Sequence, residues 1–408
     1  MNKRFDRSKL IIGVYYLHPY ARTERHIKEL VEAGVDLVVN VEEDRNMLDL
    51  LYKYGVGAVV RGIVPRWWGG CDGSMAGKFA RTHSVEKFEK PAEFVDHPAI
   101  WALDVGDEPS ALDFPHYGRV MAAVDRSFEN QFAYLNLYPC YATEFDGVGR
   151  PAECQLGTRS YEEHIARYCE NIESDYISYD FYPYSVDIPR AYENLRVVSD
   201  ACQKNGKSMW IILQVNHQDP ERFISADEMR FQAFTAMAFG VESVTWACYT
   251  PGWWHNQILD DKGEKTEQYD KMKTVNHEIK TIAGEYMKYV RTATHLVGFA
   301  GTPWETAVKQ EPEESFSTGV FRNVRAEHGE AVVIGQMVSR ANDGSYALFA
   351  AAADDPYCEN IKTYRLLFDC DRTVTALGGN GEVVVEDLGE GKKAVTIRSN
   401  EGVLIVAK

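Results

Sequence analysis

Between residue 10 and about residue 290, short apolar runs alternate eight times with longer amphipathic stretches. The runs are KLIIGVYYL, DLVVNV, GAVVRGIVP, IWALDVGDEP, FAYLNLYP, YISYDFYPY, SMWIILQVN and SVTWACYTP. Most are almost continuously apolar, which is typical of parallel strands buried on both faces. The intervening stretches, such as YEEHIARYCENI, space their apolar residues three and four apart, as amphipathic helices do. This alternation predicts an α/β fold, a closed parallel (β/α)8 (TIM) barrel.

The pattern changes near residue 298. Short β-rich runs follow, among them EAVVIGQMV, SYALFAAAA and GVLIVAK, separated by Gly, Asn and Asp. We therefore expect the barrel over residues 1–298 and a C-terminal all-β sandwich domain over residues 299–408. The polar stretch TAVKQEPEES should join the two, and the sandwich should pack on the outer helices of the barrel.

The net charge of −17 argues against nucleic acid and anionic membranes as partners. No apolar run reaches the roughly 18 residues needed to span a bilayer. The start MNKRFDRSKLIIGVYYL has the charge pattern of a signal peptide but no small-residue cleavage site. We expect a cytoplasmic monomer or homodimer, although a leader removed before this start stays open. The eight cysteines show no Cys-x-x-Cys pairing and are expected to be buried thiols.

The C-terminal ends of the strands are where such a barrel carries reactive groups. Alternation puts Asn136 and Tyr138 on one face of the fifth run and Asp180 and Tyr182 on one face of the sixth, and a proline ends both runs. The other runs and the loops after them supply His18, Tyr20, Arg61, Trp67, Trp68, Gln214, Asn216, Trp246, Trp253 and Trp254.

The fourth run leads directly into Asp107 and Glu108, and a proline follows. Burial behind a dry strand raises the pKa of a carboxyl, which suits a general acid. Two adjacent acids also push their pKa values apart. Surface charges at a helix N-terminus are the alternative, but they account poorly for Glu108, which lies between an apolar strand and a proline. Ser110 and Asp113 predict a capping box on the next helix. We expect Glu108 to be a proton donor.

The aromatic residues suggest what such a site would bind. Tryptophan pairs after the third and eighth runs, with tyrosines on the fifth and sixth, offer flat apolar faces beside polar groups, as sugar rings require. We therefore expect a carbohydrate substrate, although Trp246 fits packing equally well. Asp104 lies deeper and is expected to pair with Arg61. Without His-x-His on the first run or a Gly-rich phosphate loop, we expect no metal and no cofactor.

Four motifs in order, GDEP, NLYP, SYDFYP and WIILQ, resemble glycoside hydrolases built on a (β/α)8 barrel with an appended β-sandwich. The chain looks most like the bacterial group whose fourth strand ends in Asp-Glu-Pro, over nearly all of residues 1–300. The resemblance implies a glycosidase that cleaves a small glycoside or oligosaccharide.

Two groups of families bracket the mechanism that this resemblance implies. In clan A retaining glycosidases the fourth strand ends in Asn-Glu-Pro and the seventh carries a nucleophilic Glu. Glu108 then takes the acid/base place and Asp107 the place of the Asn, but Gln214 stands where the nucleophile is expected. Families 20 and 123 carry adjacent Asp-Glu. By that pattern Asp107 would orient a substrate acetamido group, Glu108 would protonate the leaving oxygen, and Tyr182 would help to hold the acetamide.

Three partners for Glu108 therefore stay open. We favour Asp180 as general base or nucleophile on a neutral hexoside, and carboxyl separations of about 5–5.5 Å or about 6.5–9.5 Å would indicate retention or inversion. The second is Asp107 in substrate-assisted cleavage of an N-acetylhexosaminide. The third, Glu221 or Glu228 from beyond the seventh strand, is the least favoured. A non-catalytic carbohydrate-binding barrel is the hypothesis from another class, and it requires the aromatic residues but not Glu108.

Overall fold

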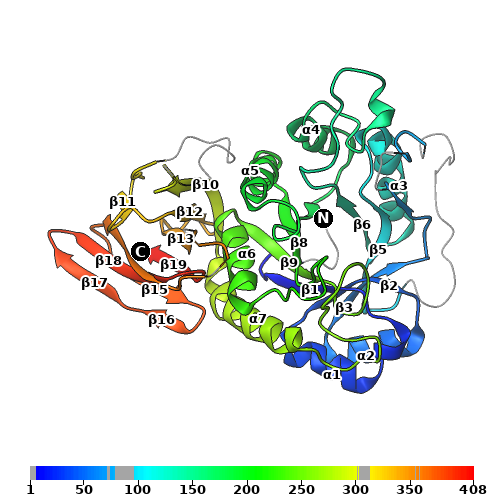
Figure 1. The fold of residues 1–408 in the computed structure, drawn as a ribbon, viewed down its shortest axis with the longest axis horizontal. Coiled ribbons are helices and arrows are strands. Elements are labelled where there is room, and N and C mark those ends of the chain that lie inside the picture. The colour runs from blue at the N-terminus through cyan, green and yellow to red at the C-terminus, as the bar shows by residue number, and fades with distance from the viewer. Residues whose placement is uncertain are drawn as a thin grey trace.

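The computed structural model describes residues 6–70, 74–78, 96–300, 302, 313–353, 355–357 and 359–408. Within them, eight parallel strands form a closed barrel (Figure 1). They are β1 (Ile11–Tyr15), β2 (Leu37–Glu42), β3 (Gly57–Arg61), β5 (Ile100–Asp107), β6 (Phe132–Leu137), β7 (Tyr176–Asp180), β8 (Ser208–Gln214) and β9 (Val241–Ala247). Pairing of β9 with β1 and of β3 with β5 closes the sheet. The predicted (β/α)8 barrel is confirmed, and each predicted run forms one of its strands.

Helices follow the strands in the expected alternation. They are α1 (Glu24–Glu32), α2 (Arg45–Tyr54), α3 (Phe114–Ser127), α4 (Tyr161–Asn171), α5 (Ile188–Asn205), α6 (Ala226–Ala238) and α7 (Glu267–Tyr286). Between β3 and β5 the described residues contain no helix, only the two-residue strand β4 (Trp67–Trp68), which pairs in parallel with β5. This departure from the barrel pattern places the Trp67–Trp68 pair beside the end of β5.

The predicted capping box before α3 does not form. The hydroxyl of Ser110 accepts a hydrogen bond from the backbone N–H of Leu112, and residues 111–113 make a short 3-10 turn. Asp113 is fully buried, and its Oδ2 accepts a hydrogen bond from the backbone N–H of Gly77. Asp113 therefore holds part of the loop between β4 and β5 against the start of α3.

Aromatic side chains fill the interior of the barrel. The rings of Tyr134 and Tyr176 are stacked at 6.1 Å, and Trp210 stacks on Tyr176 at 4.8 Å. All three side chains are buried. Because the interior is packed, polar chemistry is confined to the end of the barrel where the strands terminate.

The C-terminal part contains two antiparallel sheets, as predicted for a β-sandwich. One consists of β10 (Tyr289–Val297), β12 (Val332–Ser339), β13 (Tyr346–Ala352), β19 (Gly402–Ala407), β15 (Val374–Gly378) and β16 (Gly381–Val383). The other consists of β11 (Arg322–Ala326), β14 (Thr363–Asp369), β18 (Lys392–Arg398) and β17 (Val385–Gly389). β10 precedes the expected division at residue 298, which itself stays a prediction. Most of the expected linker, residues 306–312, lies outside the described residues.

The sandwich packs against α6 and α7, which lie beside its larger sheet in Figure 1. The ring of Phe349 contacts Phe234 of α6 at 6.4 Å and Tyr286 of α7 at 5.5 Å. Glu242, at the start of β9, forms ion pairs with Arg7 at 3.2 Å and with Arg340 at 2.6 Å. Its side chain is only 6% exposed, so one covered carboxylate joins the N-terminal segment, the barrel and the sandwich.

Two glycines should respond to alanine in opposite directions. A Cβ at Gly335 of β12 would lie 2.3 Å from the carbonyl oxygen of Ala238, whereas a Cβ at Gly284 of α7 would meet nothing within 4 Å. We expect Gly335→Ala to lower the free energy of unfolding by about 1–3 kcal/mol through overpacking, and Gly284→Ala to raise it by about 0.5–1 kcal/mol through helix propensity. Denaturant unfolding measures both changes, and equal effects would contradict the packing described.

Candidate active site

The ends of β5, β6 and β7 bring three predicted site residues together. Asp107 and Asn136 are paired in register across β5 and β6. The Asn136 amide Nδ2 donates to Asp107 Oδ1 at 3.2 Å and to Asp180 Oδ1 at 2.8 Å, while Ser178 Oγ donates to Asn136 Oδ1 at 3.0 Å. Both carboxyls therefore contact one amide whose orientation is fixed from β7.

Glu108 follows the end of β5 in a left-handed conformation, with φ of 49°. Its backbone N–H donates to the carbonyl of Asn136, and its Oε2 accepts a 2.7 Å hydrogen bond from Trp68 Nε1. A Cβ at Gly69 would lie 1.6 Å from the carbonyl oxygen of Glu108, so glycine alone permits this close approach. A non-glycine residue held at positive φ is uncommon and occurs often at functional sites.

Arg66 links two acids of this cluster. Its Nε contacts Asp104 at 2.7 Å and its Nη2 contacts Asp107 at 3.2 Å. The expected pairing of Asp104 with Arg61 is wrong, because Arg61, at the end of β3, forms its ion pair with Glu42 at the end of β2. Burial raises the pKa of Asp104 to about 6, although the guanidinium of Arg66 opposes the rise.

Burial also raises the pKa of two other carboxyls. For Glu108 the pKa lies well above its usual value because of desolvation first and then the nearby charges of Asp180 and Asp107, and the hydrogen bond from Trp68 acts in the opposite direction. For Asp180, desolvation and the charge of Asp107 raise the pKa to about 8, while the hydrogen bond from Asn136 lowers it. This arrangement favours retention of a proton on the pair formed by Glu108 and Asp180 near neutral pH.

An aromatic group lies beside these acids. The ring of Tyr182 contacts Trp254 at 5.3 Å and Trp253 at 5.9 Å. Trp253 in turn contacts Tyr15 at 5.5 Å and Tyr16 at 5.9 Å. Trp253 and Trp254 are partly exposed, so part of each indole surface is available to a ligand.

His18 and Tyr20 extend this aromatic group towards solvent. The imidazole of His18 stacks on Tyr16 at 5.5 Å, and its Nε2 lies 2.7 Å from the carbonyl oxygen of Pro251. The ring of Tyr20 lies 5.7 Å from His18, and this side chain is 39% exposed. The loops after β1 and β9 therefore meet through His18.

Tyr138 and Trp67 are more buried than Trp68, which is 47% exposed. Tyr138 is buried, and its hydroxyl donates to the carbonyl of Gly70 at 2.6 Å. Trp67 is partly buried, with its ring 5.7 Å from that of His116. In these contacts both side chains hold the loop that carries Trp68.

Three other predicted residues are fully buried by neighbouring elements. The Nδ2 of Asn216 donates to the carbonyl of Trp253 at 2.7 Å, and the amide of Gln214 is occupied by the loops after β7 and β8. Trp246 belongs to the outer core of the barrel, and its Nε1 donates to Asn276 Oδ1 of α7 at 2.7 Å. Of these three residues, Asn216 and Gln214 contact loops of the candidate site, whereas Trp246 contacts α7.

Sequence reasoning missed Arg66 and Tyr15. Arg66 is the first residue of RWWGG, where the tryptophans alone drew attention. The hydroxyl of Tyr15, at the end of β1, donates to Asp107 Oδ2 at 3.3 Å and accepts from Asn40 Nδ2 at 2.6 Å. Tyr15 has the alternation expected of an inward residue on the first run, which was a usable signal.

Two kinds of feature are absent from the residues that the structure describes. None of the helices there is long and apolar enough to cross a membrane. Within the same residues, no group of three or more His, Cys, Asp or Glu side chains is arranged to hold a metal ion.

No protein-family model and no curated protein matches the sequence, but solved structures do. Alpha-L-fucosidase isoenzyme 2 from Paenibacillus thiaminolyticus is 8% identical with a TM-score of 0.51, over 98% of this chain and 99% of that chain. A family 51 alpha-L-arabinofuranosidase from Bifidobacterium longum is 10% identical with a TM-score of 0.45, over 98% and 96%. A glycoside hydrolase family 5 mannosidase from Rhizomucor miehei is 11% identical with a TM-score of 0.44, over 69% and 94%. The likeness to the fucosidase shows a shared fold.

The raised pKa of Asp180 predicts a pH-dependent cost in stability. An unfolded Asp ionises near pH 4, whereas Asp180 in the folded protein holds its proton up to about pH 8. The stability that this carboxyl contributes at low pH is therefore lost as the pH rises through that window. We expect the Tm of Asp180→Asn to gain on that of the wild type between pH 5 and pH 8, by about 2 °C or more.

Calorimetry at several pH values measures this difference. Asp343→Asn is the matched control, because hydrogen bonds from Ser345 lower the pKa of Asp343 to about 2, outside the range tested. A Tm difference for Asp180→Asn that stays constant with pH would contradict the raised pKa.

Proposed function

We propose that this protein is a glycoside hydrolase in which Glu108 is the general acid. One observation carries the proposal. The carboxyl of Glu108, just after β5, has a pKa raised by burial and by the charges of Asp180 and Asp107, and it accepts a hydrogen bond from the exposed indole of Trp68. A carboxyl that keeps its proton near neutral pH can protonate the leaving oxygen of a glycoside. The barrel, which an alpha-L-fucosidase shares, is compatible with this activity.

Asp180 is the favoured partner of Glu108, as general base or nucleophile on a neutral hexoside. It ends β7 on the same rim, and its charge raises the pKa of Glu108. Because that charge is present only when Asp180 is ionised, Glu108 should keep its proton after Asp180 has lost its own. One acid and one base then result from two similar groups.

Substrate-assisted cleavage of an N-acetylhexosaminide is the second candidate, and the contacts of Asp107 favour it. Asp107 accepts hydrogen bonds from Tyr15, Arg66 and Asn136, which fix the carboxylate in one orientation. A fixed anion beside the acid is what an acetamido N–H requires if the acetamide oxygen is to attack the anomeric carbon. Tyr182 follows Asp180 by two positions in the chain and would flank the acetamide.

The role of Glu108 is tested by Glu108→Gln, which removes the transferable proton and keeps the shape. We expect kcat/KM to fall about 1,000-fold for alkyl glycosides and less than about 10-fold for dinitrophenyl glycosides, whose leaving groups need no proton. Initial rates on matched alkyl and aryl glucosides, galactosides and N-acetylhexosaminides measure this. Glu43→Gln, an exposed acid after β2, is the control. Equal losses on both classes would rule out general acid catalysis, and a wild type inactive on all of them would favour the non-catalytic barrel.

The pH dependence of kcat/KM separates the two mechanisms. If Asp180 is the base or nucleophile, it must be ionised, so the rate should rise as the pH passes about 8 and fall at higher pH as Glu108 loses its proton. Asp180→Asn should then lose about 1,000-fold or more in rate. If Asp107 assists an acetamido substrate, Asp180→Asn should keep about a tenth of the rate or more, and the limb near pH 8 should be absent.

A further inference from the structure

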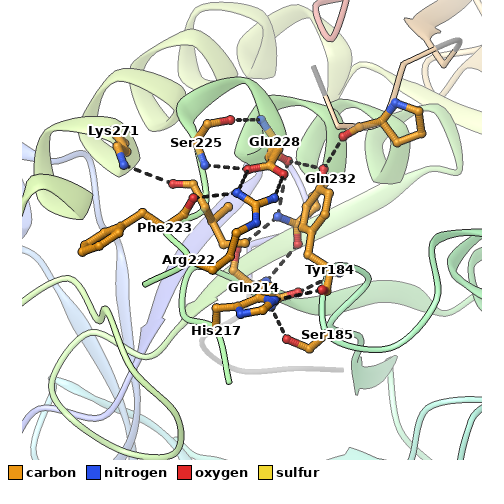
Figure 2. Close-up of polar contacts among 12 residues, drawn as sticks. Tyr184, Ser185, Gln214, His217, Arg222, Phe223, Ser225, Glu228, Gln232 and Lys271 are labelled. Carbon is orange, nitrogen blue, oxygen red and sulfur yellow. Dashed lines mark hydrogen bonds and ion pairs between the residues drawn. The ribbon is translucent and has the colours of Figure 1, made fainter. Parts of the chain in front are cut away.

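Gln214 ends β8 with its side chain fully buried. Its Oε1 accepts a hydrogen bond from the backbone N–H of Tyr184 at 3.0 Å. Its Nε2 donates to Ser185 Oγ at 2.7 Å (Figure 2). The same Nε2 also donates to the carbonyl oxygen of Asn216 at 2.8 Å. This one amide therefore ties the loop after β7 to the loop after β8.

Tyr184 continues the connection into the sandwich. Its hydroxyl lies 2.8 Å from the carbonyl oxygen of Pro356 and 3.3 Å from that of Glu228, and its own carbonyl accepts from His217 Nε2 at 3.0 Å. Pro356 follows β13, so the hydroxyl joins the barrel loop after β7 to a loop of the C-terminal domain. The rings of Tyr184 and Tyr357 also contact each other at 6.0 Å.

The other end of the network reaches the aromatic group of the candidate site. Asn216, whose carbonyl Gln214 holds, donates through Nδ2 to the carbonyl of Trp253 at 2.7 Å. His217 and His255 also exchange two backbone hydrogen bonds, at 3.1 and 2.9 Å. Hydrogen bonds thus run from Pro356 in the sandwich to Trp253 beside Tyr182.

The start of α6 gives this network a fixed base. Ser225 and Glu228 form a reciprocal capping box, and the side chain of Glu228, 1% exposed, forms an ion pair with Arg222 (Figure 2). Gln232 exchanges hydrogen bonds with the backbone N–H and carbonyl of Gln214, at 3.0 and 3.1 Å. The carboxylate of Glu228 is therefore engaged by Ser225 and Arg222 at the start of α6.

We propose that Gln214 and Tyr184 are positioning residues through which the C-terminal sandwich sets the loops that carry Tyr182 and Trp253. The expected effect on KM rests on the proposed function. The expected effect on the order of the two loops does not. The network also explains why a neutral amide stands at position 214. A carboxylate there would place an acceptor against the Asn216 carbonyl, where Nε2 now donates.

Tyr184→Phe tests the link to the sandwich, because it removes the hydroxyl and keeps the ring. We expect KM to rise about fivefold, the effect of one neutral hydrogen bond, with kcat within about twofold and with unchanged limbs of the pH profile. We also expect faster amide hydrogen exchange in residues 181–187 and 248–257. Tyr52→Phe, on α2 with 61% exposure, is the control that should change neither measurement.

Gln214→Glu tests the amide itself. It should raise KM about tenfold or more and speed exchange in the same two loops, since the donor to Asn216 is lost and an oxygen faces its carbonyl. Gln203→Glu is the matched control, because its Nε2 also donates to a carbonyl, that of Thr292 at 2.8 Å, but at the other end of the barrel. It should leave KM and the exchange of both loops unchanged.

The two readouts separate the inference from the proposed function. Unchanged exchange in both loops for Tyr184→Phe and Gln214→Glu would overturn the positioning role, whatever the activity. A gain of activity or a shifted pH profile in Gln214→Glu would also overturn it, because the side chain would then touch the reacting atoms. If the wild type cleaves no glycoside, the proposed function fails, and the exchange of the loops still decides the positioning role.

Discussion

The acidic cluster at the mouth of the barrel depends on the guanidinium of Arg66. Asp104 and Asp107 face each other's charge in a largely covered place, and Arg66 contacts both. Burying acids without such a partner costs several kcal/mol for each ion. The charge of Asp107 in turn raises the pKa of both Glu108 and Asp180. Arg66 therefore holds in place the acid whose charge favours a proton on the other two carboxyls.

The aromatic side chains inside the barrel also favour the protonated form of these carboxyls. Tyr134, Tyr176 and Trp210 exclude water below the strand ends, so the carboxyls above them lie in a medium of low polarity. Desolvation is accordingly the largest cause of the raised pKa of Asp104, Asp180 and Glu108 alike. Such a cluster lowers the free energy of unfolding, and a loss of stability of this kind is common at functional sites of proteins.

The periodicity of apolar residues was sufficient to predict the features of the fold and site that strands determine. Eight apolar runs gave the barrel, and alternation placed Asn136 and Asp180 on the rim beside Asp107. It was insufficient where a side chain comes from a loop. Arg66 reaches Asp104 only because β4 pairs with β5, a contact that no spacing in the sequence indicates.

Partner choice and strand face were the other limits of the sequence. The pairing of Arg61 with Asp104 failed because Glu42 ends the neighbouring strand and lies closer. Trp246 is an aromatic residue of the kind that binds sugar rings. It belongs instead to the outer core, where its indole N–H donates to Asn276 of α7. Gln214 lies near the end of the seventh apolar run, where a site residue is expected. Its amide is bound by the loop after β7, whose path the sequence does not indicate.

The carboxylate of Glu242 has a consequence for handling the protein. Because Arg7 and Arg340 share it, the segment around Arg7 and the sandwich are joined at one point. Proteolytic trimming past Arg7, or a bulky purification tag fused just ahead of it, would leave a charged group half-compensated and loosen a domain more than 300 positions away, since Arg340 would hold the acid alone.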